Sequence, residues 1–405
     1  MQWDVSSWDT AATWGGLEPT WEPLDAWNIE SIATRRGRKD GVSRHATGTA
    51  EVVLVWPEAA GMSTLRASAP VRLGQEMRIR ARPRDVDGTA YPIVPIYRGA
   101  VRDVQDGWEP DANGKKEFRV TVRLVDRFAD LAAVNLPETS LEGLGDTTDA
   151  RLLRIMDKAE IDAFYARFAT GVVEHQSSNF ARNLLDEAQV TVEGEVGEFY
   201  VDREGFLTLR PRYGTDPTPR ETDVQLAWAN GVDAGEHPTI PPLNFGSGQN
   251  LDDVVNQVSM ARSGGTAYTV SDTDSKLQYG LRTYQRMDLT VRYDADVEWA
   301  ADWRLEQLKA RTQRVDAVSG TVLPLMDVEA LAAVLDVELG DKHRIAWDDG
   351  DDTAAGTFHV QGVTHRVTED TWTVTVDLWA YADEGLEVGA AWGTAIWGTS
   401  TWAAG

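Results

Sequence analysis

The sequence predicts an α+β fold that is mostly β, arranged as a β region, an α+β region and a second β region. Two observations support this prediction. Short runs that alternate apolar and polar residues occur toward both ends of the chain, whereas helical spacing of apolar residues is concentrated near its middle. The 405 residues are enough for roughly two to four packed units.

Residues 28–135 are expected to form a small barrel or sandwich of strands. A β-rich run at 51–56 stops at a proline, and apolar residues alternate with polar ones at 120–124. A third strand is expected where Met77 and Ile79 alternate with arginines. We expect these arginines to form a solvated face or to pair with a neighbouring subunit, with contact to passing DNA less favoured. They are Arg78, Arg80, Arg82 and Arg84.

Residues 136–250 are expected to form an inserted α+β domain. Apolar residues at helical spacing predict one helix at 149–161 and a second at 179–189. Two β-rich runs on either side of a turn that contains Gly205 predict a β-hairpin over 198–209.

Residues 251–383 are expected to form a second β-rich domain interrupted by one helix. The last β block runs from 344 to 381, and its final strand places alternate apolar residues on one face. The helix is expected at 296–312, where one apolar stripe comprises Val297, Ala300, Ala301, Leu305 and Leu308.

Tryptophan-rich tails flank these regions, an arm at 1–27 and a repeat at 384–405. Neither segment shows a helical or strand period, and neither can bury its indoles locally. We expect them to dock on a neighbouring chain, because aromatic anchors dominate protein interfaces. An exposed flexible tail and stacking on glycan are the alternatives. The indoles concerned are Trp3, Trp8, Trp14, Trp21, Trp392, Trp397 and Trp402.

Composition excludes several classes of protein. The chain has no cysteine, which excludes disulfides and thiolate metal sites. A formal net charge of −26 argues against wrapping nucleic acid, although an acidic passage would let DNA slide without sticking. No apolar stretch reaches the ~20 residues of a membrane span, and the start lacks the pattern of a signal peptide.

No catalytic, cofactor or metal site is expected. The sequence contains no nucleophile elbow, P-loop, HExxH or dinucleotide motif. His359 and His365 could share a strand face as a metal pair, but histidines buried in a strand are the favoured interpretation. The aspartates at 348–352 miss the EF-hand spacing and predict a solvated hairpin tip. The basic cluster at 35–39 is expected to be a surface loop or subunit contact.

A succession of loose motifs resembles the minor tail proteins, or tail tip hubs, of siphophages that infect actinobacteria. The motifs follow the family's order over most of the chain. They lie at 27–54 (with Arg36-Gly37-Arg38), 74–81, 122–131, 199–210, 252–258, 275–282, 339–341 (Leu-Gly-Asp) and 360–367.

This resemblance implies two barrel-like tube domains per chain and a homotrimeric ring that matches a sixfold tail tube to a threefold tip. It further implies a location at the tip of the virion tail after assembly in the host cytoplasm. The implied partners are the distal tail protein, the C-terminus of the tape measure protein, other minor tail proteins or fibres, and DNA in transit during genome ejection.

Two other functions are weighed against the hub. A peripheral receptor-binding tail protein would display the tryptophans to cell-wall glycan, whereas a hub would bury them against neighbours. A cell-wall hydrolase is the weakest alternative, because no paired acid and base occur at a recognisable spacing.

Overall fold

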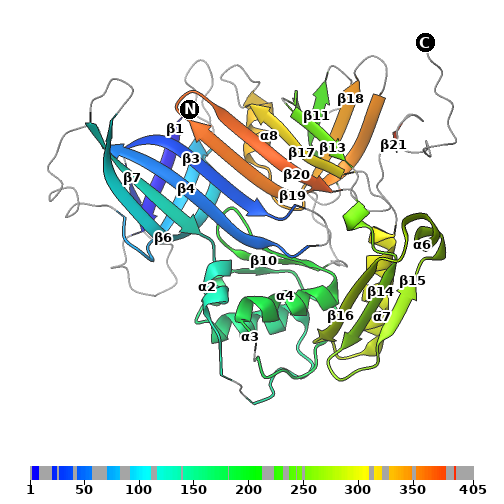
Figure 1. The fold of residues 1–405 in the computed structure, drawn as a ribbon. Coiled ribbons are helices and arrows are strands. Elements are labelled where there is room, and N and C mark those ends of the chain that lie inside the picture. The colour runs from blue at the N-terminus through cyan, green and yellow to red at the C-terminus, as the bar shows by residue number, and fades with distance from the viewer. Residues whose placement is uncertain are drawn as a thin grey trace, which may run out of the picture.

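A computed structural model describes most of the chain and confirms a mostly β, α+β fold. The described residues are 2–8, 21–24, 27–39, 43–56, 71–82, 92–110, 116–137, 140–180, 182–211, 223–230, 237–242, 244–248, 251–309, 314–321, 328–348, 353–379 and 387–388. Within them, fifteen strands form one large sheet, and two three-stranded sheets lie in separate units. Figure 1 shows the large sheet above helices α2, α3 and α4, with the third unit at the lower right.

The first part of the large sheet contains the three strands expected between 28 and 135. Antiparallel neighbours follow in the order β3 (Asn28–Gly37), β4 (Ala46–Trp56), β7 (Lys116–Val125), β6 (Val94–Pro110) and β5 (Glu76–Arg82). In β5 the side chains of Met77, Ile79 and Ala81 are fully buried and the arginines between them are half-buried. The alternation in the sequence therefore corresponds to the two faces of this strand, with the apolar side chains on the buried face and the arginines on the other.

The N-terminal segment is partly strand, although its sequence shows no strand period. β1 (Gln2–Trp8) pairs with β5 and with β2 (Trp21–Pro23). In this register Trp3 lies opposite Ala81 and Asp4 lies opposite Arg80. The sequence did not predict β1, because its pairing partner β5 is distant in the sequence and β1 has no period of its own.

The second part of the large sheet is built around the long strand β19 (Thr353–Thr368). Residues 353–359 of β19 pair with β18 (Lys342–Asp348), residues 359–367 with β20 (Trp372–Trp379), and residues 362–368 with β3. β19 therefore belongs to both parts of the sheet. The remaining elements are β17 (Arg314–Thr321), β13 (Asn244–Gly248), β11 (Val224–Asn230), β12 (Thr239–Ile240), β21 (Glu387–Val388) and α8 (Val328–Leu335).

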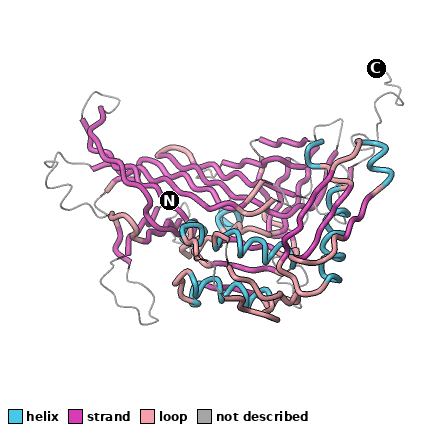
Figure 2. Tube along the Cα trace, turned by 60° about the horizontal axis from the view of Figure 1, so that its bottom comes forward, coloured by secondary structure: helices cyan, strands magenta, loops and turns pink. Residues whose placement is uncertain are grey.

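One hydrophobic core continues through both parts of this sheet. The expected final strand is β20, in which Trp372, Val374, Val376 and Leu378 are all buried. Figure 2 shows a broad band of strands across the upper part of the molecule, with most of the helices below it and at the right.

The middle unit contains the expected helices and hairpin. It comprises α2 (Phe128–Ala133), α3 (Thr148–Lys158), η1 (Ala163–Tyr165), β8 (Ala166–Phe168), α4 (Leu184–Glu195), β9 (Glu198–Val201) and β10 (Leu207–Arg210), around its own core. The second helix begins later than its sequence pattern predicts. Phe180 has a φ of +50°, which a helix cannot continue through, and the Asn183 side chain caps the N–H of Leu185.

The third unit comprises η2 (Leu251–Asp253), β14 (Gln257–Arg262), β15 (Tyr268–Ser271), α6 (Thr273–Tyr279), β16 (Thr283–Leu289) and α7 (Asp294–Leu308). The predicted stripe of α7 packs on the sheet as a separate core. The large sheet takes strands from both of the expected domains 136–250 and 251–383. Strands at 224–248 belong to the large sheet, and 251–309 forms its own unit.

Candidate functional site

A buried cluster of charges lies where the large sheet meets the middle unit. Arg36 of β3 donates to Glu338, which follows α8, at 2.5 Å. Their side chains are 3% and 10% exposed. Glu338 also accepts from the backbone N–H of Arg203 at 3.1 Å, in the β9–β10 turn, and from that of Leu339 at 2.8 Å. The Arg203 guanidinium in turn pairs with Asp336.

Arg38 extends this cluster by bonding three segments. Its guanidinium donates to Gln361 of β19 at 2.7 Å, to Glu198 of β9 at 2.7 Å and to the carbonyl of Ser43 at 2.8 Å. We call the set Arg36, Arg38, Glu198, Arg203, Glu338 and Gln361 the junction. Arg36 and Arg38 are buried, so the expectation of a surface loop at 35–39 was wrong for these two residues. Strand β3 places them next to β19, whose pairing the sequence did not predict.

Two glycines allow the segments of the junction to approach one another. Gly37 has a φ of +91°, and a Cβ there would collide with the carbonyl of Gln361 and lie 2.8 Å from the Cα of Gly362. Gly340 has a φ of +80°, and a Cβ would collide with the guanidinium of Arg210. That guanidinium donates to the carbonyl of Leu339 at 2.7 Å. Only glycine fits both positions without strain.

The junction keeps its charges paired at neutral pH. Burial alone would raise the pKa of Glu338, but Arg36 and Arg203 outweigh it and hold the pKa below its usual range. Burial, together with Arg36 and Arg203, lowers the pKa of His365 to about 3. His365, which lies beside the junction, is therefore neutral. The buried ion pairs of the junction hold its segments together as a structural connection.

A second buried group supports the start of α2. The Asp126 carboxylate accepts from the N–H of Gly48 at 2.6 Å and from that of Phe128 at 3.0 Å. The Tyr97 hydroxyl donates to the carbonyl of Gly48 at 2.9 Å. Burial raises the pKa of Asp126 to about 7, although both N–H bonds oppose this shift. Asp126 thus connects β4, β7 and the middle unit.

A threonine, a histidine and a glutamate meet in the middle unit, and all three are buried. The imidazole of His175 lies 3.0 Å from the hydroxyls of Thr148 and Thr290, and Thr148 donates to Glu195 at 2.6 Å. Thr148 and His175 are both 0% exposed. Burial, followed by the charge of Arg151, lowers the pKa of His175 to about 3, so it is neutral. This arrangement is a packing contact between α3, α4 and the end of β16.

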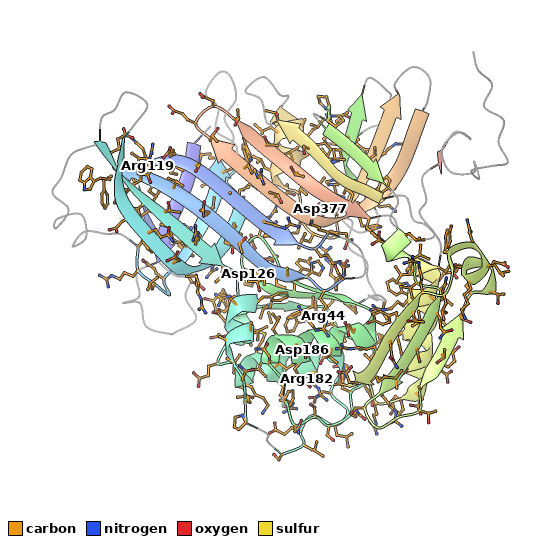
Figure 3. The ribbon with its side chains drawn as sticks, viewed as in Figure 1. Arg44, Arg119, Asp126, Arg182, Asp186 and Asp377 are labelled. Carbon is orange, nitrogen blue, oxygen red and sulfur yellow. The ribbon has the colours of Figure 1, made fainter. Side chains whose placement is uncertain are left out.

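Helix α4 is ion-paired on two sides. Arg44, just before β4, pairs with Asp186 and, at 3.0 Å, with Glu193. Arg182 pairs with Glu187 at 3.0 Å and with Asp288 of β16 at 2.8 Å. Figure 3 labels Arg44, Asp186 and Arg182 along this helix. These pairs connect the middle unit to the large sheet and to the third unit.

The motifs that carry the family resemblance meet in space. The segments with Arg36 and Arg38, the 199–210 hairpin, the Leu-Gly-Asp at 339–341 and the strand at 360–367 all contribute to the junction or border it. Asn256, from another motif, donates to the carbonyl of Gly280 at 2.7 Å and accepts from the N–H of Arg282 at 2.8 Å. Motif segments that lie far apart in the sequence therefore contact one another in the folded chain.

The structure describes part of the predicted interface. Trp3 and Trp8 lie in β1, and Trp14, Trp392, Trp397 and Trp402 lie outside the described residues. The ring of Trp21 stacks under the guanidinium of Arg78 at 4.3 Å and lies 5.2 Å from that of Arg98. Trp21 thus already has contacts within its own chain.

This stack continues into the middle unit. Arg98 donates to Glu76 at 2.5 Å, and Arg127 pairs with the same carboxylate. The guanidinium of Arg127 lies 3.3 Å from the ring centre of Tyr165 in η1. Arg80 and Arg82 are half-buried on the same strand as Arg78. These contacts, like Glu338 and Arg203, were not predicted, because no local pattern reports which side chains meet across units.

Metal ligands do not gather in the described part of the chain. No group of three or more His, Cys, Asp or Glu residues there is arranged to hold an ion. His365 is buried, and residues 349–352 of the predicted hairpin tip lie outside the described residues. Among the described helices, none is long and apolar enough to cross a membrane.

Comparison with solved structures identifies tail proteins of the same fold. No family model and no curated protein matches the chain. The tail protein from Neisseria meningitidis MC58 has a TM-score of 0.55 at 10% identity, covering 93% of this chain and 99% of that protein. The 43 kDa tail protein of prophage MuSo2 from Shewanella oneidensis has a TM-score of 0.55 at 12% identity, covering 94% and 98%. The chain has the fold of these tail proteins over nearly its whole length.

Proposed function

We propose that this chain is a structural protein of a bacteriophage tail and that it forms the homotrimeric hub of the tail tip. The observation that carries the proposal is the fold shared with two tail proteins from end to end. The succession of hub-like motifs supports it, because several of them meet at the junction.

The proposed partners are two further copies of the chain, the distal tail protein, the C-terminus of the tape measure protein, and other minor tail proteins or fibres. DNA would pass only in transit, during genome ejection. The two parts of the large sheet would act as the tube domains, and the middle and third units would lie outside them. The host is proposed to be an actinobacterium and the virus a siphovirus.

A structural role without an active site or cofactor fits the chemistry of the described residues. The junction pairs its buried charges with one another, and Thr148 and His175 are closed to solvent. Pairing of this kind specifies how units are held together. We therefore propose that the chain is not an enzyme.

The test is the position and symmetry of this chain in a cryo-EM map of the intact virion. Three copies in a closed ring at the end of a sixfold tube would support the hub. Copies found only at the periphery, with their indoles facing solvent, would overturn it. That result would instead favour a receptor-binding protein that contacts cell-wall glycan.

A further inference from the structure

Helix α6 directs its leucine away from the unit that carries it. Leu277 is 81% exposed, more than any other large hydrophobic side chain of the described residues. Leu281, which follows the helix after Gly280, is 65% exposed. We call Leu277 and Leu281 the leucine platform. Within α6, every residue of which is described, only Ser275 is buried. A helix on the surface of a protein ordinarily does the opposite and packs its apolar side on the core.

Polar contacts hold α6 in place. The Asp272 carboxylate caps the first turn of the helix at 2.8 Å, and Lys276 donates to the side chain of Gln257 in β14 at 2.9 Å. The Asn256 side chain bonds the backbone on both sides of Leu281. Because these contacts are made by polar groups, they position the segment and leave the leucine platform directed outward.

The leucine platform differs from the other exposed hydrophobic side chains. Single exposed leucines are common on protein surfaces, and Leu73, Leu141 and Leu144 are examples in loops of this chain. In α6, regular structure fixes the direction of the side chain, and a second exposed leucine follows four positions later. Apolar area of this kind gains free energy when a partner removes it from water. The leucine platform therefore has the properties of a docking surface.

The charges beside α6 are mixed, which favours an uncharged partner. Lys309, just after α7, lies 3.8 Å from Asp272 and 2.7 Å from Glu306. Within the helix, Asp274 and Lys276 have opposite charges. A strongly acidic or strongly basic partner would therefore meet like charges as well as opposite ones at this surface.

The C-terminal segment 389–405 has the composition that such a surface requires. It contains no acidic or basic residue, although charged residues make up 26% of the chain. It carries three indoles, Trp392, Trp397 and Trp402, together with Ile396. Large aromatic side chains bury much apolar area, and a segment without charges has no charge to desolvate when it docks. Residues 389–405 themselves lie outside the described residues.

This segment begins on the same side of the molecule as α6. β21 ends at Val388 and pairs with Ala354 and Ala355 of β19. Figure 1 shows both β21 and α6 at the right of the molecule. Residues 389–405 can span at most ~56–61 Å when extended. Helix α7 has 15 residues and is about 22 Å long, so the segment is more than twice as long as this helix of the third unit.

We propose that the leucine platform is the docking site of the C-terminal segment of the same chain, and that the indoles of this segment cover Leu277 and Leu281. This docking goes beyond the proposed hub function, because it takes place within one chain. It would connect the second part of the large sheet, where β21 lies, to the third unit. It also differs from the expectation from the sequence, in which the indoles dock on a neighbouring chain.

The absence of cysteine allows the docking to be measured by cross-linking in the full chain. One cysteine is introduced in the segment as Ala395→Cys and a second on α6 as Gln278→Cys. The matched control combines Ala395→Cys with Asp157→Cys, an exposed position on helix α3. Each isolated variant is treated with a short bismaleimide, and the linked peptides are identified by mass spectrometry. We expect the pair 395 and 278 to cross-link about tenfold faster than the control pair, with the mass of a single chain.

Leucine substitutions in the same cysteine background test the contact itself. Leu277→Ser with Leu281→Ser should lower the rate of cross-linking about tenfold, because the docked indoles lose their apolar partner. Leu141→Ser with Leu144→Ser is the matched control and should leave the rate unchanged. All four leucines are exposed, so these changes leave the fold intact.

Three results would overturn the docking. Equal rates at 278 and 157 would show that the segment has no preferred site. An unchanged rate after the substitutions at 277 and 281 would show that the leucine platform does not hold it. A cross-linked product with twice the mass of the chain would place the segment on a second copy.

Discussion

Replacing Gly37 by alanine should cost the protein far more stability than the same change at Gly74. Both glycines have positive φ, +91° and +78°, so both variants pay the ~1–2 kcal/mol of a left-handed residue. At Gly74 nothing lies within 4 Å of the added Cβ. At Gly37 the Cβ collides with Gln361 and lies 2.7 Å from the side chain of Leu339, and overpacking of this kind costs about 1–3 kcal/mol more.

The free energy of unfolding can be measured by urea titration with tryptophan fluorescence as the signal. Alanine also restricts the unfolded chain, which offsets about 0.4–1 kcal/mol in both variants. We therefore expect a loss of about 1 kcal/mol for Gly74→Ala and about 3 kcal/mol for Gly37→Ala. Equal losses would refute the argument that β3 and β19 approach too closely at the junction for any side chain.

Four further changes give distinct readouts. Glu338→Gln leaves Arg36 buried without a charged partner and should cost about 3 kcal/mol at pH 7 in urea unfolding. Because the pKa of Glu338 is lowered in the folded state, its contribution is present above pH 4.5 and lost as the pH falls, so the variant should lose less in acid. The pKa of Asp126 is raised to about 7, so its contribution to stability should fall as the pH rises from 4 to 7; Asp126→Asn should remove that contribution and make the dependence on pH shallower. Asn256→Ala should cost about 1–3 kcal/mol and speed hydrogen exchange at its partner N–H in the third unit. Deleting 391–405 should leave the folded body intact but impair virion assembly, and normal plaque yield would contradict this.

Elements whose signal is local were predicted from the sequence. The hairpin at 198–209 is β9 and β10, and its turn contains Gly205 with a φ of +83°. The stripe at 296–312 is the buried side of α7. In both cases the residues that specify the element lie within it, so periodicity and turn chemistry were enough.

Elements specified by distant partners were missed. β1 exists because β5, more than sixty residues away, offers an edge in register with it. The strands at 224–248 return to the large sheet after the middle unit, and the sequence contains no signal for that return. Pairing partners follow from the topology of the whole chain, which one sequence does not report.

The side-chain contacts of the junction could not be predicted from the sequence for the same reason, because their partners are distant in the chain. Glu338 and Arg36 are 302 positions apart, and the local sequence around either residue does not indicate that the two side chains pair. Gly37 and Gly340, which lie in two of the motifs, both have positive φ at close approaches. At Gly37 the neighbouring atoms are backbone atoms of Gln361 and Gly362, whereas at Gly340 they belong to the side chains of Arg210 and Glu198.

Exposed acidic surfaces and buried arginine pairs divide the charge of the described residues. Acidic residues are concentrated on surfaces such as the exposed side of α7, where Asp294, Glu298, Asp302 and Glu306 recur every four residues. Like charges at this spacing weaken a helix, so the stripe is not explained by helix stability. Exposed acid of this kind repels phosphate, whereas the arginines of the junction are buried and paired with Glu338 and Glu198.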